Sequence, residues 1–250
     1  MIHSPQQARK LFLTLICTEL LLVVVYATDV WVNGPSGELD GLVDLDAEGN
    51  LPAWFSSFQL ALIAISFWVL TARRRATERP SRRFLRTCGG FFLLLSIDET
   101  AMLHERLTHL LGSRYIDWVP AYLGNHMVNT IICVLVLAAC IAAACPHLAG
   151  LWKMSRRASL TAIAGCVIYL TGAAVLESIG YKMLNSGSPI WSYRAEVAAE
   201  EFLEMLGVSM ILYGVLLFCC LAKAVPRPAS PRRGAGCAYH SARHWLELKF

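Results

Sequence analysis

Charged residues are scarce in this chain. They make up 16% of its 250 residues, hydrophobic residues make up 56%, and the mean hydropathy is +0.51. Soluble globular domains carry roughly a quarter charged residues, so this is not the composition of an ordinary soluble domain. Recognition motifs for nucleic acid are also lacking, and aromatic residues do not interleave with the arginines. We therefore expect no nucleic-acid partner.

Thiol motifs are missing as well. The nine cysteines form no Cys-x-x-Cys spacing, which argues against a thiolate metal site or a redox pair. Except for Cys237 in the C-terminal tail, they lie in or at the ends of long apolar segments. None lies in a predicted outer loop, where an oxidising compartment would pair it. We interpret the cysteines as small apolar residues of helix packing.

Six segments are long and apolar enough to cross a bilayer, which takes about 20 residues each. We predict an all-α integral membrane bundle of six transmembrane helices over residues 1–222. The spans lie near residues 11–31, 54–72, 84–105, 121–145, 158–184 and 196–221. Glu19 interrupts the first span and no cleavage site follows, so we interpret this span as a retained helix rather than a signal peptide. Residues 223–250 are predicted to form a basic, disordered cytoplasmic tail.

The basic residues predict the orientation. Of the 22 Lys and Arg residues, all but four lie before span one, after span six, or in the loops after spans two and four. The four exceptions are Arg106, Arg114, Lys182 and Arg194. Positive charge marks the cytoplasmic side, so both termini are predicted to be cytoplasmic. The arginine-rich loop after span two would suit anionic lipid heads, but we interpret it as a topology signal.

The first outer loop, residues 32–53, is rich in glycine and acidic residues. Asp44, Asp46 and Gly49 reproduce the opening spacing of a calcium loop. Phe55 stands at position 12, where the bidentate Glu of such a loop belongs, and Pro52 stands at position 9. We therefore favour a solvated acidic turn over a calcium site.

The strongly polar residues of spans three to six all fall in the outer half of the membrane under this topology. Clustered carboxylates in a low dielectric require protons or a cation. Carboxylates with imidazole and without thiolate suit iron, manganese or zinc. We therefore predict a divalent metal site in the outer leaflet. Its candidate ligands are Asp98, Glu99, His104, Glu105, His126, Glu177, Glu200, Glu201 and Glu204.

Helical spacing gathers some of these residues on common faces. One stripe comprises Asp98, Met102, Glu105 and His109. Glu200 and Glu201 are four and three residues before Glu204, so all three can converge near Glu204. The Glu-x-x-His motif of di-iron bundles is absent. His104 and His109 are one residue too far apart for the zincin arrangement.

The acidic cluster also has a less specific interpretation, in which its groups are solvated or paired within the protein. Several of the groups would be solvated where a helix leaves the membrane: Glu105, His109, Glu196, Glu200 and Glu201. Glu196 would also be favoured there by the helix dipole. Arg194 or Lys182 would then form a structural pair with one of the carboxylates.

Three blocks resemble a family of uncharacterised multi-pass bacterial membrane proteins. They are Asn-Leu-Pro-Ala-Trp-Phe-Ser-Ser at 50–57, Ile-Asp-Glu at 97–99 with Leu-His-Glu at 103–105, and Glu-Glu-Phe-Leu-Glu-Met-Leu-Gly at 200–207. The resemblance covers spans two to six and the preceding loop. It implies a bacterial inner membrane and brings no activity.

Four functions are consistent with these patterns. The first is a membrane-embedded metal site, either enzymatic or purely metal-binding, that a lipid or quinone substrate would approach sideways. The second is a cation or proton transporter, although few polar residues continue toward the inner face. The third is a haem protein with His104 and His126 as axial ligands. The fourth is a structural membrane protein with internally paired carboxylates.

Overall fold

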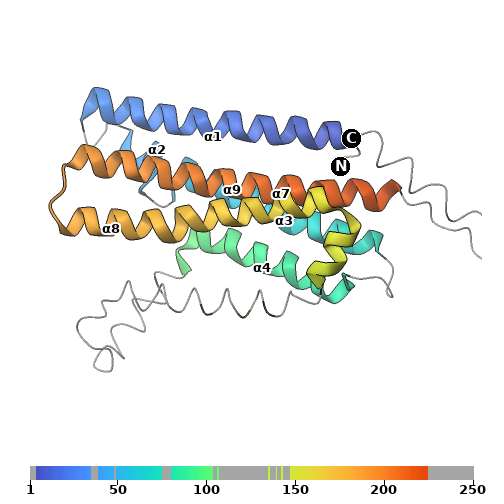
Figure 1. Ribbon diagram of the computed structural model, residues 1–250. Coiled ribbons are helices and arrows are strands. Elements are labelled where there is room, and N and C mark those ends of the chain that lie inside the picture. Colours follow the sequence, from blue (N-terminus) through green and yellow to red (C-terminus); the bar gives the residue numbers. More distant parts are fainter. Residues whose placement is uncertain are drawn as a thin grey trace, which may run out of the picture.

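The computed structural model describes residues 4–34, 39–47, 49–74, 80–103, 106, 135, 139, 142 and 147–224. Within these ranges the chain is helical and contains no strand. Its elements are α1 (Pro5–Asn33), α2 (Asp40–Val43), α3 (Leu51–Arg73), α4 (Arg82–Ala101), α7 (Arg156–Leu170), the π-helix η2 (Thr171–Leu176), α8 (Glu177–Asn185) and α9 (Ile190–Ala224). The long helices run side by side along one axis (Figure 1).

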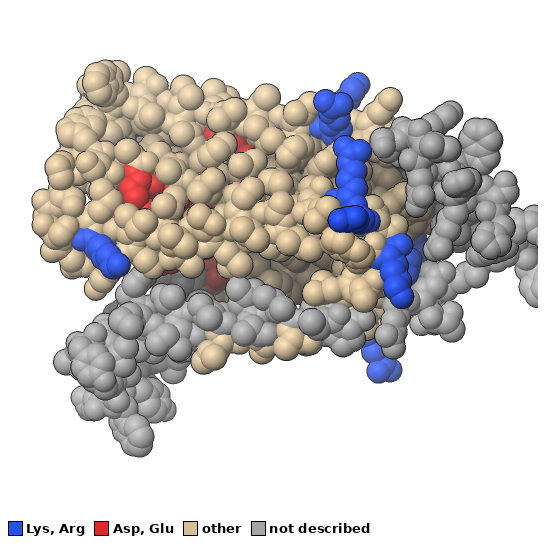
Figure 2. Space-filling model, in the orientation of Figure 1, with Lys and Arg blue, Asp and Glu red and all other residues tan. Residues whose placement is uncertain are grey.

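Helix α9 is the centre of the bundle. It packs against α1, against α3, and against the continuous run of α7, η2 and α8, while α4 packs on α3. The long helices extend between two ends of the bundle (Figure 1). We call the end with the start of α1 and the end of α9 the basic end, and the end with α2 and the α8–α9 turn the loop end. Figure 2 shows Lys and Arg side chains gathered toward the basic end.

Four helices in the described part of the chain are long and apolar enough to cross a membrane. They are Pro5–Asn33, Leu51–Arg73, Arg156–Asn185 and Ile190–Ala222. They coincide with predicted spans one, two, five and six, so the chain has the character of a membrane protein. Predicted span three corresponds to α4, whose polar ends keep it out of this group. Predicted span four and the tail beyond 224 lie almost wholly outside the described residues.

The helix starts follow from local sequence. Four helices begin just after a side chain that accepts a hydrogen bond from a backbone N–H of the first turn, and these caps are Ser4, Asn50, Ser81 and Ser155. Such caps satisfy N–H groups that have no partner inside the helix. Pro5 and Pro52 occupy the first turn, where a missing N–H costs nothing. Local chemistry therefore sets where the spans start.

Glycines bring α7 and α9 into close contact. A Cβ placed at Gly165 would lie 2.7 Å from the Gly207 carbonyl oxygen. A Cβ at Gly214 would lie 2.9 Å from the carbonyl oxygen of Ala158. Small residues that allow backbones to approach are typical of helix pairs in membranes, where burial of apolar surface does not drive association.

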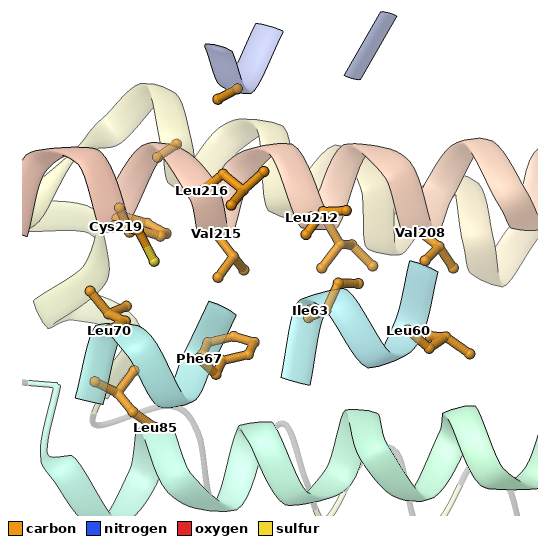
Figure 3. Packing of buried hydrophobic residues seen from close by; sticks show 14 of the residues in the cluster. Leu60, Ile63, Phe67, Leu70, Leu85, Val208, Leu212, Val215, Leu216 and Cys219 are labelled. Atoms are coloured by element: carbon orange, nitrogen blue, oxygen red, sulfur yellow. The ribbon is translucent and has the colours of Figure 1, made fainter. Parts of the chain in front are cut away.

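The buried apolar core lies toward the basic end. Ile63, Phe67 and Leu70 of α3 face Leu212 and Val215 of α9 (Figure 3). A second buried cluster lies toward the loop end, and its members are Leu22, Tyr26, Val30, Leu45, Val197 and Met205.

Candidate carboxylate site

The last turn of α4 carries Asp98 and Glu99, and the helix ends there. Met102 adopts the left-handed conformation with φ 53° and ψ 41°, and its N–H donates to the Asp98 carbonyl at 2.8 Å. It is the one described residue other than glycine with a positive φ. The predicted stripe of Asp98, Met102, Glu105 and His109 requires one continuous helix. Helix α4 ends at Ala101 and the left-handed Met102 interrupts the helix, while Glu105 and His109 lie outside the described residues. Helical bonding resumes where Arg106 N donates to the Met102 carbonyl at 3.0 Å.

Such a break has a physical cost. The left-handed conformation costs an L-residue other than glycine about 1–2 kcal/mol. Strained residues persist where the surrounding structure holds them, and they are common near functional sites. Here the break separates Asp98 and Glu99 from His104 and Glu105, which lie outside the described residues.

A second irregularity faces α9. Helix α7 continues into the π-helix η2, and Gly172 lies in this segment. A Cβ at Gly172 would lie 2.8 Å from Glu204 Cγ and 2.9 Å from the Glu200 carbonyl oxygen. Glycine therefore makes room for the Glu204 side chain between the two helices. π-helical turns inside α-helices are frequent at functional sites.

Tyr169, two residues before η2, lies within electrostatic reach of four carboxylates. Its hydroxyl interacts electrostatically with Glu204 most strongly, and then with Glu99, Glu201 and Asp98. Two of these residues come from α4 and two from α9, so the tertiary structure brings together carboxylates about 100 positions apart. Asp98, Glu99, Glu201 and Glu204 all belong to the predicted ligand set, and that set stays a prediction.

Tyr169 itself was missed by the sequence reasoning. It is half-buried in an apolar stretch of predicted span five and belongs to no motif. Its phenol is the one polar side-chain group in the run from Cys166 to Leu170. A phenol in an otherwise apolar span was the sequence signal that could have identified Tyr169 as a candidate site residue.

The remaining carboxylates form a second group toward the loop end. Glu200 interacts electrostatically with Glu196, then with Glu177 and Asp46. Glu196 lies over Gly180, where a Cβ would be 2.5 Å from its Oε2 atom. The solvated position predicted for Glu196 is wrong for its carboxylate, since both oxygens are buried. Glu177 is exposed at the first turn of α8.

The acidic loop is tied to the start of α9. Arg194 Nη1 lies 3.3 Å from Asp44 Oδ1 and 3.4 Å from Asp46 Oδ2. Tyr193 donates its hydroxyl to Asp46 at 2.9 Å, and Asn50 donates its amide to the Asp44 carbonyl. The solvated acidic turn predicted here is wrong for Asp44, which is only 8% exposed. The predicted pairing of Arg194 is present, but its partners are these loop residues.

The described residues hold only part of the predicted metal-ligand set. Within them, no three His, Cys, Asp or Glu side chains form a group that could hold a metal ion. His104, Glu105 and His126 belong to the predicted ligand set and lie outside the described residues. A metal centre built from the predicted ligand set would therefore include at least one of these three.

Comparison with known proteins adds the family. No curated protein and no solved structure matches the chain. A family described as a domain of unknown function, DUF8692, matches residues 14–222, which include every candidate ligand named above. This agrees with the resemblance to an uncharacterised family. The chain belongs to the DUF8692 family.

Proposed function

We propose that this protein is a metal-binding membrane protein whose site lies in the outer half of the bilayer. Asp98, Glu99, Glu201 and Glu204 would supply carboxylate ligands, and His104, Glu105 or His126 would complete the set. Iron, manganese or zinc suits such donors. A lipid or quinone would reach the site sideways from the bilayer.

The observation that carries this proposal is the gathering of four carboxylates around Tyr169. Like charges in a low dielectric favour a bound cation or protons. A phenol beside carboxylates adds an oxygen that can donate a hydrogen bond to a ligand. In membrane spans, clustered ionisable groups mark functional sites by default.

The topology belongs to the same proposal. We place six spans in a bacterial inner membrane, with both termini on the cytoplasmic side. The collection of basic side chains at one end of the bundle supports this orientation. Helix α4 ends near the loop end and α7 begins near the basic end, which supports one further crossing between them.

Transport through the bundle is less well supported. Toward the basic end, α3 and α9 meet through the apolar core of Ile63, Phe67, Leu212 and Val215 (Figure 3). A conducting path needs polar or charged lining groups, and these four side chains are apolar. We therefore favour a one-sided site.

The test is elemental analysis of the full chain, purified in detergent after metal-replete expression. Wild type is expected to carry stoichiometric iron, manganese or zinc. Glu204→Gln and His104→Ala are each expected to lose at least tenfold in metal occupancy. Asp40→Asn is the matched control, because Asp40 begins α2 in the acidic loop, belongs to no predicted ligand set and should leave occupancy unchanged.

Two outcomes would refute the metal site. One is a wild-type protein with near-zero metal. The other is equal metal content in wild type, Glu204→Gln and His104→Ala, which would mean that the bound metal lies elsewhere. An absorption spectrum of the same sample tests the haem alternative.

A further inference from the structure

A buried polar junction joins three helices away from the carboxylate site. Glu19 of α1, Gln59 of α3 and Ser209 of α9 meet there, and each is 0% exposed. Ser209 follows Glu204 by five residues, which is about 7–8 Å along a helix at 1.5 Å per residue. The junction is therefore a separate feature of the bundle, and nothing in the proposed function uses it.

The hydrogen bonds at this junction converge on one carboxylate oxygen. Gln59 Nε2 donates to Glu19 Oε1 at 2.8 Å and to Ser209 Oγ at 2.8 Å. Ser209 Oγ donates to Glu19 Oε1 at 2.6 Å. The amide has two hydrogens and the hydroxyl has one, so all three available hydrogens are used.

Two oxygens remain without a donor. Glu19 Oε2 and Gln59 Oε1 are buried and have no hydrogen-bond partner among the described residues. Rotating the Gln59 amide by half a turn does not remove the deficit, because its oxygen would then face Glu19 and Ser209. The junction is short of a hydrogen-bond donor in either orientation.

The surroundings supply no compensating charge. No Lys, Arg or His of the described chain forms an ion pair with Glu19. Helix α3 has no ionisable side chain before Arg73. At the α1–α9 interface, Tyr213 is stacked on Phe12, and Tyr26 is bonded to Arg194 rather than to Glu19.

Apolar layers close the junction on both sides. Leu22 and Met205 lie toward the loop end, and Ile63 and Leu212 lie toward the basic end. An ionised carboxylate without a partner is costly in such an interior. A neutral carboxylic acid removes the charge and supplies one O–H donor.

We infer that the Glu19–Gln59–Ser209 junction is a proton-binding site, in which Glu19 is a neutral carboxylic acid. The bound proton lies on Oε2 and supplies the donor that the three side chains lack. Release of this proton would leave a buried negative charge between α1, α3 and α9. Protonation of Glu19 is thereby coupled to the packing of the three helices.

Infrared difference spectroscopy tests this inference on the full chain in lipid nanodiscs. Solvent-exposed glutamates are ionised at pH 7. The spectrum of wild type minus Glu19→Gln at pH 7 is expected to contain the C=O stretching band of a protonated carboxylic acid. Ser209→Ala removes a hydrogen bond to the same group, so it is expected to shift that band without abolishing it.

Three results would overturn the inference. One is a difference spectrum that contains ionised-carboxylate bands and no acid band. Another is a carboxylate band that depends on added sodium, which would assign the junction to a metal cation. The third is an unchanged acid band in Ser209→Ala. Because this variant is measured separately, the inference is tested even if Glu19→Gln fails to fold.

Discussion

The close contact of α7 with α9 makes Gly207 the most sensitive packing position near the carboxylate site. A Cβ there would lie 2.6 Å from Tyr169 N and 2.7 Å from the Gly165 carbonyl oxygen. Non-bonded heavy atoms prefer separations of about 3.5–4.0 Å. The neighbours are backbone atoms, so they cannot rotate away. Gly207→Ala must therefore push the two helices apart.

The expected cost follows from overpacking, which is typically about 1–3 kcal/mol. That range corresponds to roughly a five- to 150-fold change in the unfolding equilibrium, at 1.4 kcal/mol per tenfold. Alanine also favours a helix over glycine by about 1 kcal/mol, which offsets part of the loss. Gly90→Ala is the matched control, since Gly90 lies in α4 and its added Cβ would meet nothing within 4 Å.

The assay is equilibrium unfolding of both variants and wild type under the same detergent conditions. The difference between Gly207→Ala and Gly90→Ala cancels the helix-propensity gain and isolates the packing term. We expect Gly207→Ala to be less stable than Gly90→Ala by about 1–3 kcal/mol. Equal stability of the two variants would refute the contact between α7 and α9.

Three further predictions concern the break in α4, the acidic loop and the α3–α4 contact. Met102→Gly is expected to raise the unfolding free energy by about 1 kcal/mol, because glycine relieves left-handed strain; a less stable variant would contradict the strain. Arg194→Gln removes a charged hydrogen bond to Asp44, so it is expected to lower the unfolding free energy by about 1.5–3 kcal/mol and to speed proteolysis of the 39–50 loop. Unchanged proteolysis would contradict the attachment of this loop to α9 through Arg194. Ser57 of α3 and Ser96 of α4 share hydrogen bonds of 2.6–2.9 Å, so replacing either serine by alanine is expected to lower the unfolding free energy by about 0.6 kcal/mol in thermal unfolding. The double variant is expected to lose less than the sum of the two single losses. Full additivity would show that the two serines do not interact.

Much of the architecture could be predicted because its causes are local. An apolar run of about 20 residues must form a helix in lipid to satisfy its backbone groups, whatever its neighbours are. Four of the six predicted spans coincide with apolar helices for this reason. Their starts are also local, as the caps at Asn50 and Ser155 show.

The candidate site was predicted in part. Periodicity placed Glu201 and Glu204 on neighbouring positions of one helix, and topology placed Asp98 and Glu99 at the same depth. Their common neighbour Tyr169 could not be identified, because it lies on another helix whose rotation about its axis depends on glycine contacts with α9.

Gln59 was also missed as a candidate functional residue, for a different reason. Span two has no charged residue before Arg73, and none of its residues was among the predicted site residues. A carboxamide buried in an apolar helix is costly unless it is hydrogen-bonded, and this cost was the signal that pointed to a partner. The identity of the partners, Glu19 and Ser209, follows only from which helices are adjacent.

The sequence by itself determined that this chain is helical, has the character of a membrane protein, and where four of its apolar helices run. These properties depend on hydrophobicity and helical period, which act within one segment. The tertiary structure decided the neighbours: Tyr169 among the carboxylates, Arg194 on the acidic loop, and Glu19 with Gln59 and Ser209. In a membrane, apolar burial does not select helix partners, so small-residue contacts and hydrogen bonds between distant segments make that choice.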